Sequence, residues 1–321
     1  MTSTPLTAGV DLGGTKIQTV VVRDEEVVGN ARVLTPQTGD PGDVVDAIVG
    51  TIRSSLEASG GSEADLRAIG IGTPGEIDAR TGTCLRAANV PGFSDRVALG
   101  PLVSKQLGKT KVKVGNDVSV GVLGEYRRGA GRPYKNLLGV WVGTGVGGGL
   151  VIDGKLYDGR GAGGEIGHVV VRPGGLRCSC GRRGCLEAYA GRASMERRAR
   201  ALVRRGHKTD LFKIMKKRGR DHASSGVYAR ALAQKDRMTT RLVRDAAWAL
   251  GLGIASAQNL LDLEAIIIGG GLGDRLGQGF VDDIVREMTP HLFVPDEPPT
   301  VLRTELGDLS GAVGAAVLAG G

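Results

Sequence analysis

The sequence is poor in aromatic residues, which make up 3% of its 321 residues, and rich in glycine, which occurs 54 times. With so few rings, the hydrophobic cores must be packed mainly by valine, isoleucine, leucine and alanine. Frequent glycine indicates many turns between regular elements. This composition favours a turn-rich α/β protein, and the length suits two domains of ordinary size.

Cysteine is also scarce, with four in the chain, which indicates a reducing compartment. No positively charged, signal-like segment precedes the first predicted strand at about Leu6. An uncharged run of 16 residues, Ala246–Leu261, includes Ser256, Gln258 and Asn259. It falls short of the roughly 20 apolar residues of a membrane span. We therefore expect a soluble, cytoplasmic protein without a membrane segment.

Charge is unevenly distributed along the chain. The net charge is +8, yet the segment from Arg192 to Arg244 holds 17 Lys and Arg against 4 Asp and Glu. Helical patterns at Met195–Arg205, Asp210–Lys217 and Ala229–Lys235 indicate that much of this charge forms solvated helix faces. A basic face can also attract polyanions, but aromatic side chains for base stacking are nearly absent from the segment.

Three of the four cysteines are close together: Cys178, Cys180 and Cys185, with His168 ten residues before the first. Three thiolates and one imidazole make a closed tetrahedral zinc set. Small buried cysteines or a disulfide are the alternatives. A Cys-x-Cys pair is a cramped disulfide, and neighbouring arginines indicate a loop. We therefore predict a structural zinc with all four positions filled by protein.

Two carboxylates flank this zinc knot, Glu165 before His168 and Glu187 after Cys185. Ionised groups rarely lie beside a metal site without a partner. We therefore expect Glu165 and Glu187 to face a polar ligand.

Glycine-rich turns follow several predicted strands. In the first, Asp11 ends a strand, Gly13 and Gly14 turn the chain, and Thr15 and Lys16 offer a hydroxyl and a charge. Such bare backbone lets N–H groups approach a phosphate closely. Taken alone, the turn could be an ordinary hairpin.

A second turn, Gly143–Gly145, carries Thr144 between two more predicted strands. Its similarity to the first turn suggests a duplicated fold that clamps phosphates. A third glycine run ends the buried strand that begins at Ala265. A flat adenine ring could lie there against the bare backbone of Gly270 and Gly271.

Asn116 and Asp117 follow a short predicted strand, at the end where α/β proteins place ligands. The same dipeptide could instead form a turn or cap a helix. Two loops that contain Gly75 and Asn89 precede it.

Taken together, these motifs resemble the ROK family (repressor, open reading frame, kinase), and within it the bacterial ATP-dependent glucokinases. The resemblance implies a two-domain actin-like (ribonuclease-H-like) α/β sugar kinase fold with a cleft between the domains. The N-terminal domain would span residues 1–116, completed by a C-terminal helix at 310–321. The second domain would span 117–309 and carry the zinc knot. The matching residues are Asp11–Lys16, Thr73–Gly75, Asn116–Asp117, Gly143–Gly149, Glu165–His168, the three cysteines with Glu187, and Gly269–Gly271.

The resemblance also implies a role for each motif. Asp117 would be the general base that takes the proton of the sugar's 6-hydroxyl as it attacks the γ-phosphate. His168 would bind zinc through one ring nitrogen and the sugar through the other. Asp11 would reach Mg²⁺ that accompanies ATP. The implied sugar-binding residues are Gly75, Asn89, Asn116, Asp117, Glu165, His168 and Glu187. The implied nucleotide-binding residues are Asp11, Gly13, Gly14, Thr15, Lys16, Gly143, Thr144, Gly145, Gly270 and Gly271.

Several alternatives stay open. The substrate could be another hexose, such as N-acetylmannosamine, N-acetylglucosamine or fructose. Polyphosphate could replace ATP, which the basic segment would suit. Sugar-sensing repressors of the family carry a DNA-binding domain before the phosphate turn, whereas only ten residues precede Asp11. We therefore expect no DNA-binding domain, and from the resemblance a homo-oligomer, either dimer or tetramer.

Overall fold

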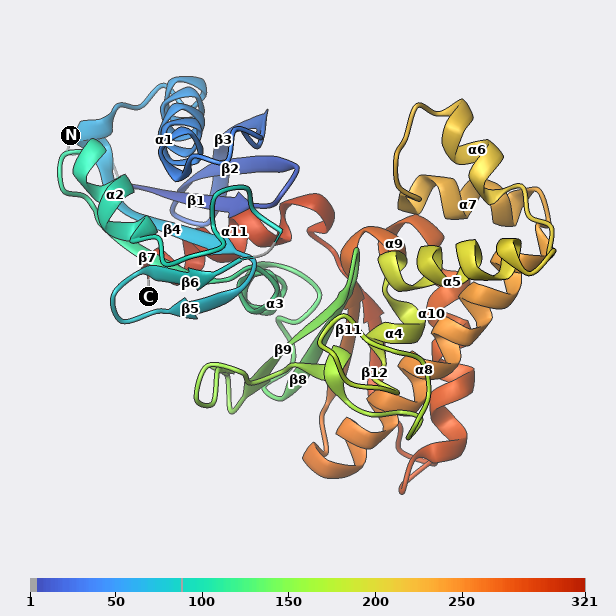
Figure 1. Cartoon of the computed structure of the whole chain (residues 1–321). Helices are drawn as coiled ribbons and strands as arrows, with labels where there is room; N and C mark the ends of the chain where they lie inside the picture. Colours follow the sequence, from blue (N-terminus) through green and yellow to red (C-terminus); the bar gives the residue numbers. More distant parts are fainter. Residues whose placement is uncertain (1–4, 88, 321) are drawn as a thin grey trace. The chain divides into compact units, whose positions relative to one another are not determined.

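The computed structural model describes residues 5–87 and 89–320, and its chain forms two compact units. The first unit comprises Met1–Pro133, Leu156–Gly163 and Asp308–Gly321. The second comprises Tyr134–Lys155 and Gly164–Gly307. Figure 1 shows that the chain's last helix, in red, lies among the blue and green elements of the first unit.

The first unit is built on a five-stranded sheet in the order β3-β2-β1-β4-β7. β1 pairs with β2 in antiparallel and with β4 in parallel orientation, and β4 continues in parallel to β7. The strands are β1 (Leu6–Leu12), β2 (Lys16–Arg23), β3 (Glu26–Leu34), β4 (Leu66–Thr73) and β7 (Lys111–Asn116), with a separate pair β5 (Glu76–Asp78) and β6 (Thr83–Arg86). The carboxyl ends of β1, β4 and β7 therefore meet at one edge.

Helices cover this sheet. Asp40 caps the first one, since its carboxylate accepts from Gly42 N at 2.8 Å, and the helix then buries a stripe of Val, Ile and Leu. The helical elements are α1 (Pro41–Ala58), η1 (Glu63–Asp65), α2 (Leu99–Gln106), α3 (Asp117–Arg128), η4 (Gly307–Leu309) and α11 (Ser310–Gly320).

The last helix, α11, comes very close to the backbone of its neighbours. A Cβ placed on Gly70 would lie 1.7 Å from Ala315 O, and one on Gly314 would lie 1.8 Å from Val120 O. Glycine at these positions lets α11 approach β4 and α3 closely. As a result, α3 belongs to the first unit, which continues to Pro133, whereas the sequence placed the boundary at 116/117.

The second unit repeats the sheet pattern of the first, in the order β10-β9-β8-β11-β12. β8 pairs antiparallel with β9 and parallel with β11, which pairs parallel with β12. The strands are β8 (Leu137–Val142), β9 (Val146–Ile152), β10 (Lys155–Tyr157), β11 (Ala265–Gly269) and β12 (Thr300–Arg303). Both glycine turns therefore join the antiparallel hairpin at the start of a sheet, as the sequence predicted.

Most of the helices within residues 5–87 and 89–320 belong to the second unit, and one face of the long α8 is buried in its core. They are η2 (Ile166–His168), α4 (Glu187–Ala190), α5 (Arg192–Arg204), α6 (Leu211–Lys217), α7 (Ser225–Ala233), α8 (Arg237–Leu261), α9 (Gly270–Leu276), α10 (Gln278–Met288) and η3 (Thr289–His291). Within residues 5–87 and 89–320, no helix combines the length and apolarity needed to span a membrane.

Candidate functional site

The first glycine turn is held by a network of backbone bonds. Gly13 N donates to Lys16 O at 2.9 Å, and the hydroxyl of the buried Thr35 donates to Gly13 O at 2.6 Å. A Cβ on Gly14 would lie 1.9 Å from Asn89 O, so only glycine lets this turn meet the loop that carries Asn89. The turn thus presents bare, fixed backbone, as a phosphate site requires.

Asp11 lies near the end of β1, beside this turn. Burial raises the pKa of Asp11 to about 6, with Lys16 lowering it and Asp308 raising it. Lys16 Nζ lies 3.7 Å from Asp308 Oδ2, so the lysine divides its charge between two carboxylates. The ionised form of Asp11 therefore lowers the stability of the folded protein, and a cation bound beside it would offset this loss.

We expect Asp11→Asn to stabilise the ligand-free protein at neutral pH. The pKa of Asp11 is 3.8 in the unfolded chain and about 6 in the folded protein. As the pH rises from 3.8 to 6, the unfolded chain loses this proton more readily than the folded protein, so the carboxyl increasingly disfavours folding. The full effect is about 3 kcal/mol, reached above pH 6 and absent below pH 3.8. Thermal unfolding should show a gain of several degrees at pH 7.5 that shrinks toward zero near pH 4. The exposed Asp221→Asn serves as control, and an equal gain at both pH values would contradict the prediction.

Asn116 and Asp117 lie where β7 passes into α3. Asn116 caps the helix, because its Oδ1 accepts from Val118 N at 3.0 Å and Ser119 N at 3.2 Å. Its Nδ2 donates to Gly75 O at 3.3 Å. Asp117 Oδ1 accepts from Val118 N at 2.9 Å. The capping role considered as an alternative is therefore present, and it fixes both side chains.

Asp11 and Asp117 share the same edge of the first sheet. Asp11 pairs with Gly72 of β4, and the next residue of β4, Thr73, pairs with Asn116. A Cβ on Gly72 would lie 3.5 Å from the Cα of Asp117. The carboxyl ends of these parallel strands thus gather the two acids, as ligand sites in α/β sheets do.

Gly75, in the loop that Asn116 contacts, has φ +100°, and a Cβ there would lie 2.1 Å from Arg86 O. The loop conformation therefore requires glycine. Asn89 is exposed.

In the second unit, the structure brings together the predicted metal ligands His168, Cys178, Cys180 and Cys185. Their ligand atoms all lie within 4.8 Å of one another. Cys178 Sγ lies 3.8 Å from His168 Nδ1, and Cys180 Sγ lies 3.7 Å from Cys185 Sγ. A tetrahedral zinc with Zn–S bonds of about 2.3 Å has S–S edges of about 3.8 Å. The spacing fits the ion, and the three cysteines of the cluster are free thiols, as is Cys84.

Arg182 favours the ionised form of one of these thiols, Cys180. Hydrogen bonding to Arg182 lowers the pKa of Cys180 to about 6. The thiolate is the form that binds metals. Burial instead raises the pKa of Cys178 and of Cys185, so Cys180 is the thiol of the cluster that ionises most readily.

Glu187 connects the cysteine cluster with the second glycine turn. Its Oε1 accepts from Ser179 Oγ at 2.6 Å, and its Oε2 accepts from Val146 N at 3.1 Å. A Cβ on Gly145 would lie 2.3 Å from Glu187 Oε2. The sequence placed Glu187 beside a polar ligand but gave no signal for this link. Glu165 is exposed and precedes η2, where His168 N donates to its backbone oxygen at 3.0 Å.

The second glycine turn is also closed by backbone bonds. Gly143 N donates to Gly145 O at 2.9 Å, and Ala193 N at the start of α5 donates to Thr144 O at 3.1 Å. The third glycine run begins α9, where Gly270 has φ +79° and a Cβ would lie 2.7 Å from Val142 N. The sequence reasoning missed α5 as a neighbour of the turn, because it treated α5 only as part of a basic segment.

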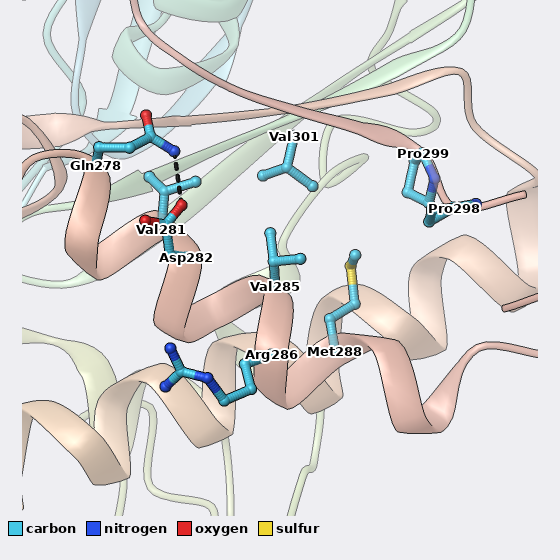
Figure 2. A pocket seen from close by; sticks show the side chains of 9 residues that line it. All are labelled: Gln278, Val281, Asp282, Val285, Arg286, Met288, Pro298, Pro299 and Val301. Carbon is cyan, nitrogen blue, oxygen red and sulfur yellow. Dashed lines mark hydrogen bonds between the residues drawn. The ribbon is translucent and has the colours of Figure 1, made fainter. Parts of the chain in front are cut away.

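A hollow of about 410 Å³ lies elsewhere in the second unit, against α10 and the start of β12 (Figure 2). Its polar side chains bond to their own helix: Gln278 Nε2 donates to Asp282 Oδ1 at 2.9 Å, and Arg286 pairs with Asp283 at 2.7 Å. None of the predicted site residues lines it. The lining residues are Gln278, Val281, Asp282, Val285, Arg286, Met288, Pro298, Pro299 and Val301.

Comparison with known proteins agrees with the resemblance seen in the sequence. The sequence model of the ROK family matches residues 7–321. A glucokinase of Thermotoga maritima is 35% identical, with 96% of this chain and 95% of the relative covered. A kanosamine kinase of Amycolatopsis mediterranei is 31% identical, over 99% of this chain and 97% of the relative.

A crystal structure of a ROK family glucokinase from Streptomyces griseus, in complex with glucose and AMPPNP, has a TM-score of 0.80 to this fold. It is 34% identical, and the match covers 98% of this chain and 99% of the other. The predicted two-domain α/β sugar kinase fold is therefore confirmed.

Proposed function

Because this chain belongs to the ROK family, we propose that it is an ATP-dependent glucokinase, which transfers the γ-phosphate of ATP to the 6-hydroxyl of glucose. One observation carries the proposal: the glucokinase from Streptomyces griseus, crystallised with glucose and AMPPNP, shares the fold at 34% identity over nearly the whole chain. The Asn116–Asp117 motif and the two glycine turns support it, since they supply an acid and phosphate-binding backbone.

In this proposal Asp117 is the general base. It takes the proton of the sugar's 6-hydroxyl while that oxygen bonds to the γ-phosphorus and ADP leaves with the electrons of the broken P–O bond. Val118 N and the helix start hold the carboxylate in place. Asn116, fixed by its cap and by Gly75, orients the adjoining sugar hydroxyl.

The remaining predicted residues are proposed to bind Mg²⁺, the sugar or the nucleotide. Asp11 is proposed to reach the Mg²⁺ that accompanies ATP, and this ion would neutralise phosphate charge. The acceptors proposed for the sugar hydroxyls are Glu165, His168 and Glu187, with Gly75 and Asn89 lining the sugar. The backbone proposed for the nucleotide comprises Gly13, Gly14, Thr15 and Lys16, then Gly143, Thr144 and Gly145, and finally Gly270 and Gly271.

We further propose that the four-residue cluster holds a structural zinc. The spacing of the three sulfurs and the His168 ring nitrogen fits a tetrahedral ion site. His168 faces Cys178 with Nδ1, which leaves Nε2 as the ring nitrogen proposed to meet a sugar hydroxyl. Such a metal fixes the imidazole as an outer support of the sugar site.

A second candidate substrate is an amino sugar, since a kanosamine kinase is 31% identical over 99% of the chain. A coupled assay with ATP and Mg²⁺ should therefore compare glucose with kanosamine, N-acetylglucosamine, N-acetylmannosamine and fructose. The expected result is the highest kcat/KM for glucose. A higher kcat/KM for kanosamine would identify an amino sugar, and not glucose, as the preferred substrate. Turnover of no sugar would refute the kinase proposal. Polyphosphate in place of ATP tests the donor in the same assay.

A further inference from the structure

Arg192, the first residue of α5, contacts the second glycine turn through both backbone and side chain. Its N donates to Gly143 O at 3.1 Å, and its Nη2 donates to Thr144 Oγ1 at 3.0 Å. Tyr228 supports it from α7, since its hydroxyl donates to Arg192 O at 3.1 Å. The guanidinium is therefore fixed beside the turn that the sequence associates with phosphate.

The charge of Arg192 has no anionic partner among the described residues. Two other arginines of α5 pair with carboxylates: Arg198 with Asp245 and Arg200 with Glu196, both at 2.6 Å. Arg192 is half-buried, its Nε is buried without a hydrogen-bond partner, and burial lowers its pKa. A desolvated guanidinium is costly unless a strong acceptor binds it.

The surroundings indicate which anion fits. Gly143 and Gly145 leave the turn without side chains, and the Thr144 hydroxyl lies against the guanidinium. Arginine presents a planar fork of donors that matches two oxygens of a phosphate. The Nη2 end of Arg192 and Thr144 Oγ1 lie at the exposed side of the residue, so a phosphate can reach them from solvent.

We propose that Arg192 binds the di- or triphosphate tail of the nucleotide donor and is a phosphate-binding residue in addition to the glycine turns. The proposal rests on the proposed kinase function for the nucleotide's identity. It makes Arg192 distinct from the other basic residues of the Arg192–Arg244 segment, which either pair with carboxylates or are exposed. The positive charge also compensates the negative charge on the phosphates during transfer.

The test is calorimetric binding of ADP and adenosine to the full chain and its variants. Arg192→Gln should weaken ADP binding by about 10- to 100-fold, the range of a charge-assisted hydrogen bond, and leave adenosine binding unchanged. Arg192→Lys should recover part of the ADP affinity, because it restores the charge without the fork. Arg197→Gln is the matched control: it lies in the same helix, is exposed and bonds to Ser194 at 2.8 Å. It should bind ADP as the parent protein does.

The outcomes separate this proposal from the proposed function. If Arg192→Gln binds ADP as tightly as the parent, or loses adenosine to the same extent, Arg192 does not bind phosphate and the inference is wrong. If ADP binding falls as expected while no sugar is phosphorylated, the inference stands and the glucokinase proposal fails. Steady-state kinetics add a second readout: the KM for ATP should rise while the KM for glucose stays constant. Should Arg192→Gln not fold, Arg192→Lys gives the same comparison with a smaller expected loss.

Discussion

Asp117→Ala is expected to lower kcat by about 10²- to 10⁴-fold, the usual contribution of a general base, while the Kd for glucose changes by only a few-fold. The sugar hydroxyl then loses the group that accepts its proton, but Asn116 and its cap stay in place. Steady-state kinetics with ATP and a direct titration with glucose separate these two effects. Turnover close to that of the parent protein would remove Asp117 as the base.

Asp117→Asn is the control for structure. Asp117 Oδ1 accepts from Val118 N at 2.9 Å, and an asparagine oxygen keeps this bond while its amide cannot take a proton. We expect Asp117→Asn to fold like the parent protein and to be as inactive as the alanine variant. If Asp117→Asn were active and Asp117→Ala were not, the loss would come from the start of α3 and not from the base.

The sequence predicted the regular elements that place these residues. Glycine turns between apolar runs located both hairpins, and buried strands such as Ala265–Gly269 appear where expected. The helix cap that the sequence offered as an alternative role for the Asn116–Asp117 pair is present, since α3 begins at Asp117 and Asn116 caps it. These features depend on local signals, namely turn glycines, capping side chains and periodic burial, so one sequence is enough to find them.

Other features depend on contacts between distant segments, and no local pattern reveals them. Gly70 and Gly314 are unremarkable in the sequence, yet they let α11 pack on the backbone of β4 and α3. This packing assigns α3 to the first unit. The bond between Glu187 and Val146 links residues 41 positions apart, and the contact between Arg192 and Thr144 links residues 48 apart. The sequence shows that Glu187 and Arg192 are charged, but only the folded structure shows which residues they contact.

The second large effect concerns the metal. Cys180→Ser is expected to reduce bound zinc from about one ion per chain to a small fraction, because structural zinc needs all four ligands. Cys180 is exposed, so the substitution removes a ligand with little change in core packing. The metal content measured by mass spectrometry after gel filtration, together with the melting temperature, provides the readout. We expect a melting temperature several degrees lower, since zinc binding stabilises the folded loop.

Cys84→Ala is the matched control, since Cys84 is a buried cysteine of the first unit and not part of the cluster. It should keep its zinc whatever it loses in packing. In Cys180→Ser, the loop that holds Cys178 and Ser179 also loses the zinc that would fix it. This loop matters for Glu187, because Ser179 Oγ donates to Glu187 Oε1 at 2.6 Å. We therefore expect the KM for glucose to rise by about 10- to 100-fold, as for other supports of a binding group. Full zinc content in Cys180→Ser would show that Cys180 is not a required ligand. Full activity in a zinc-free protein would show that the cluster does not act through a metal.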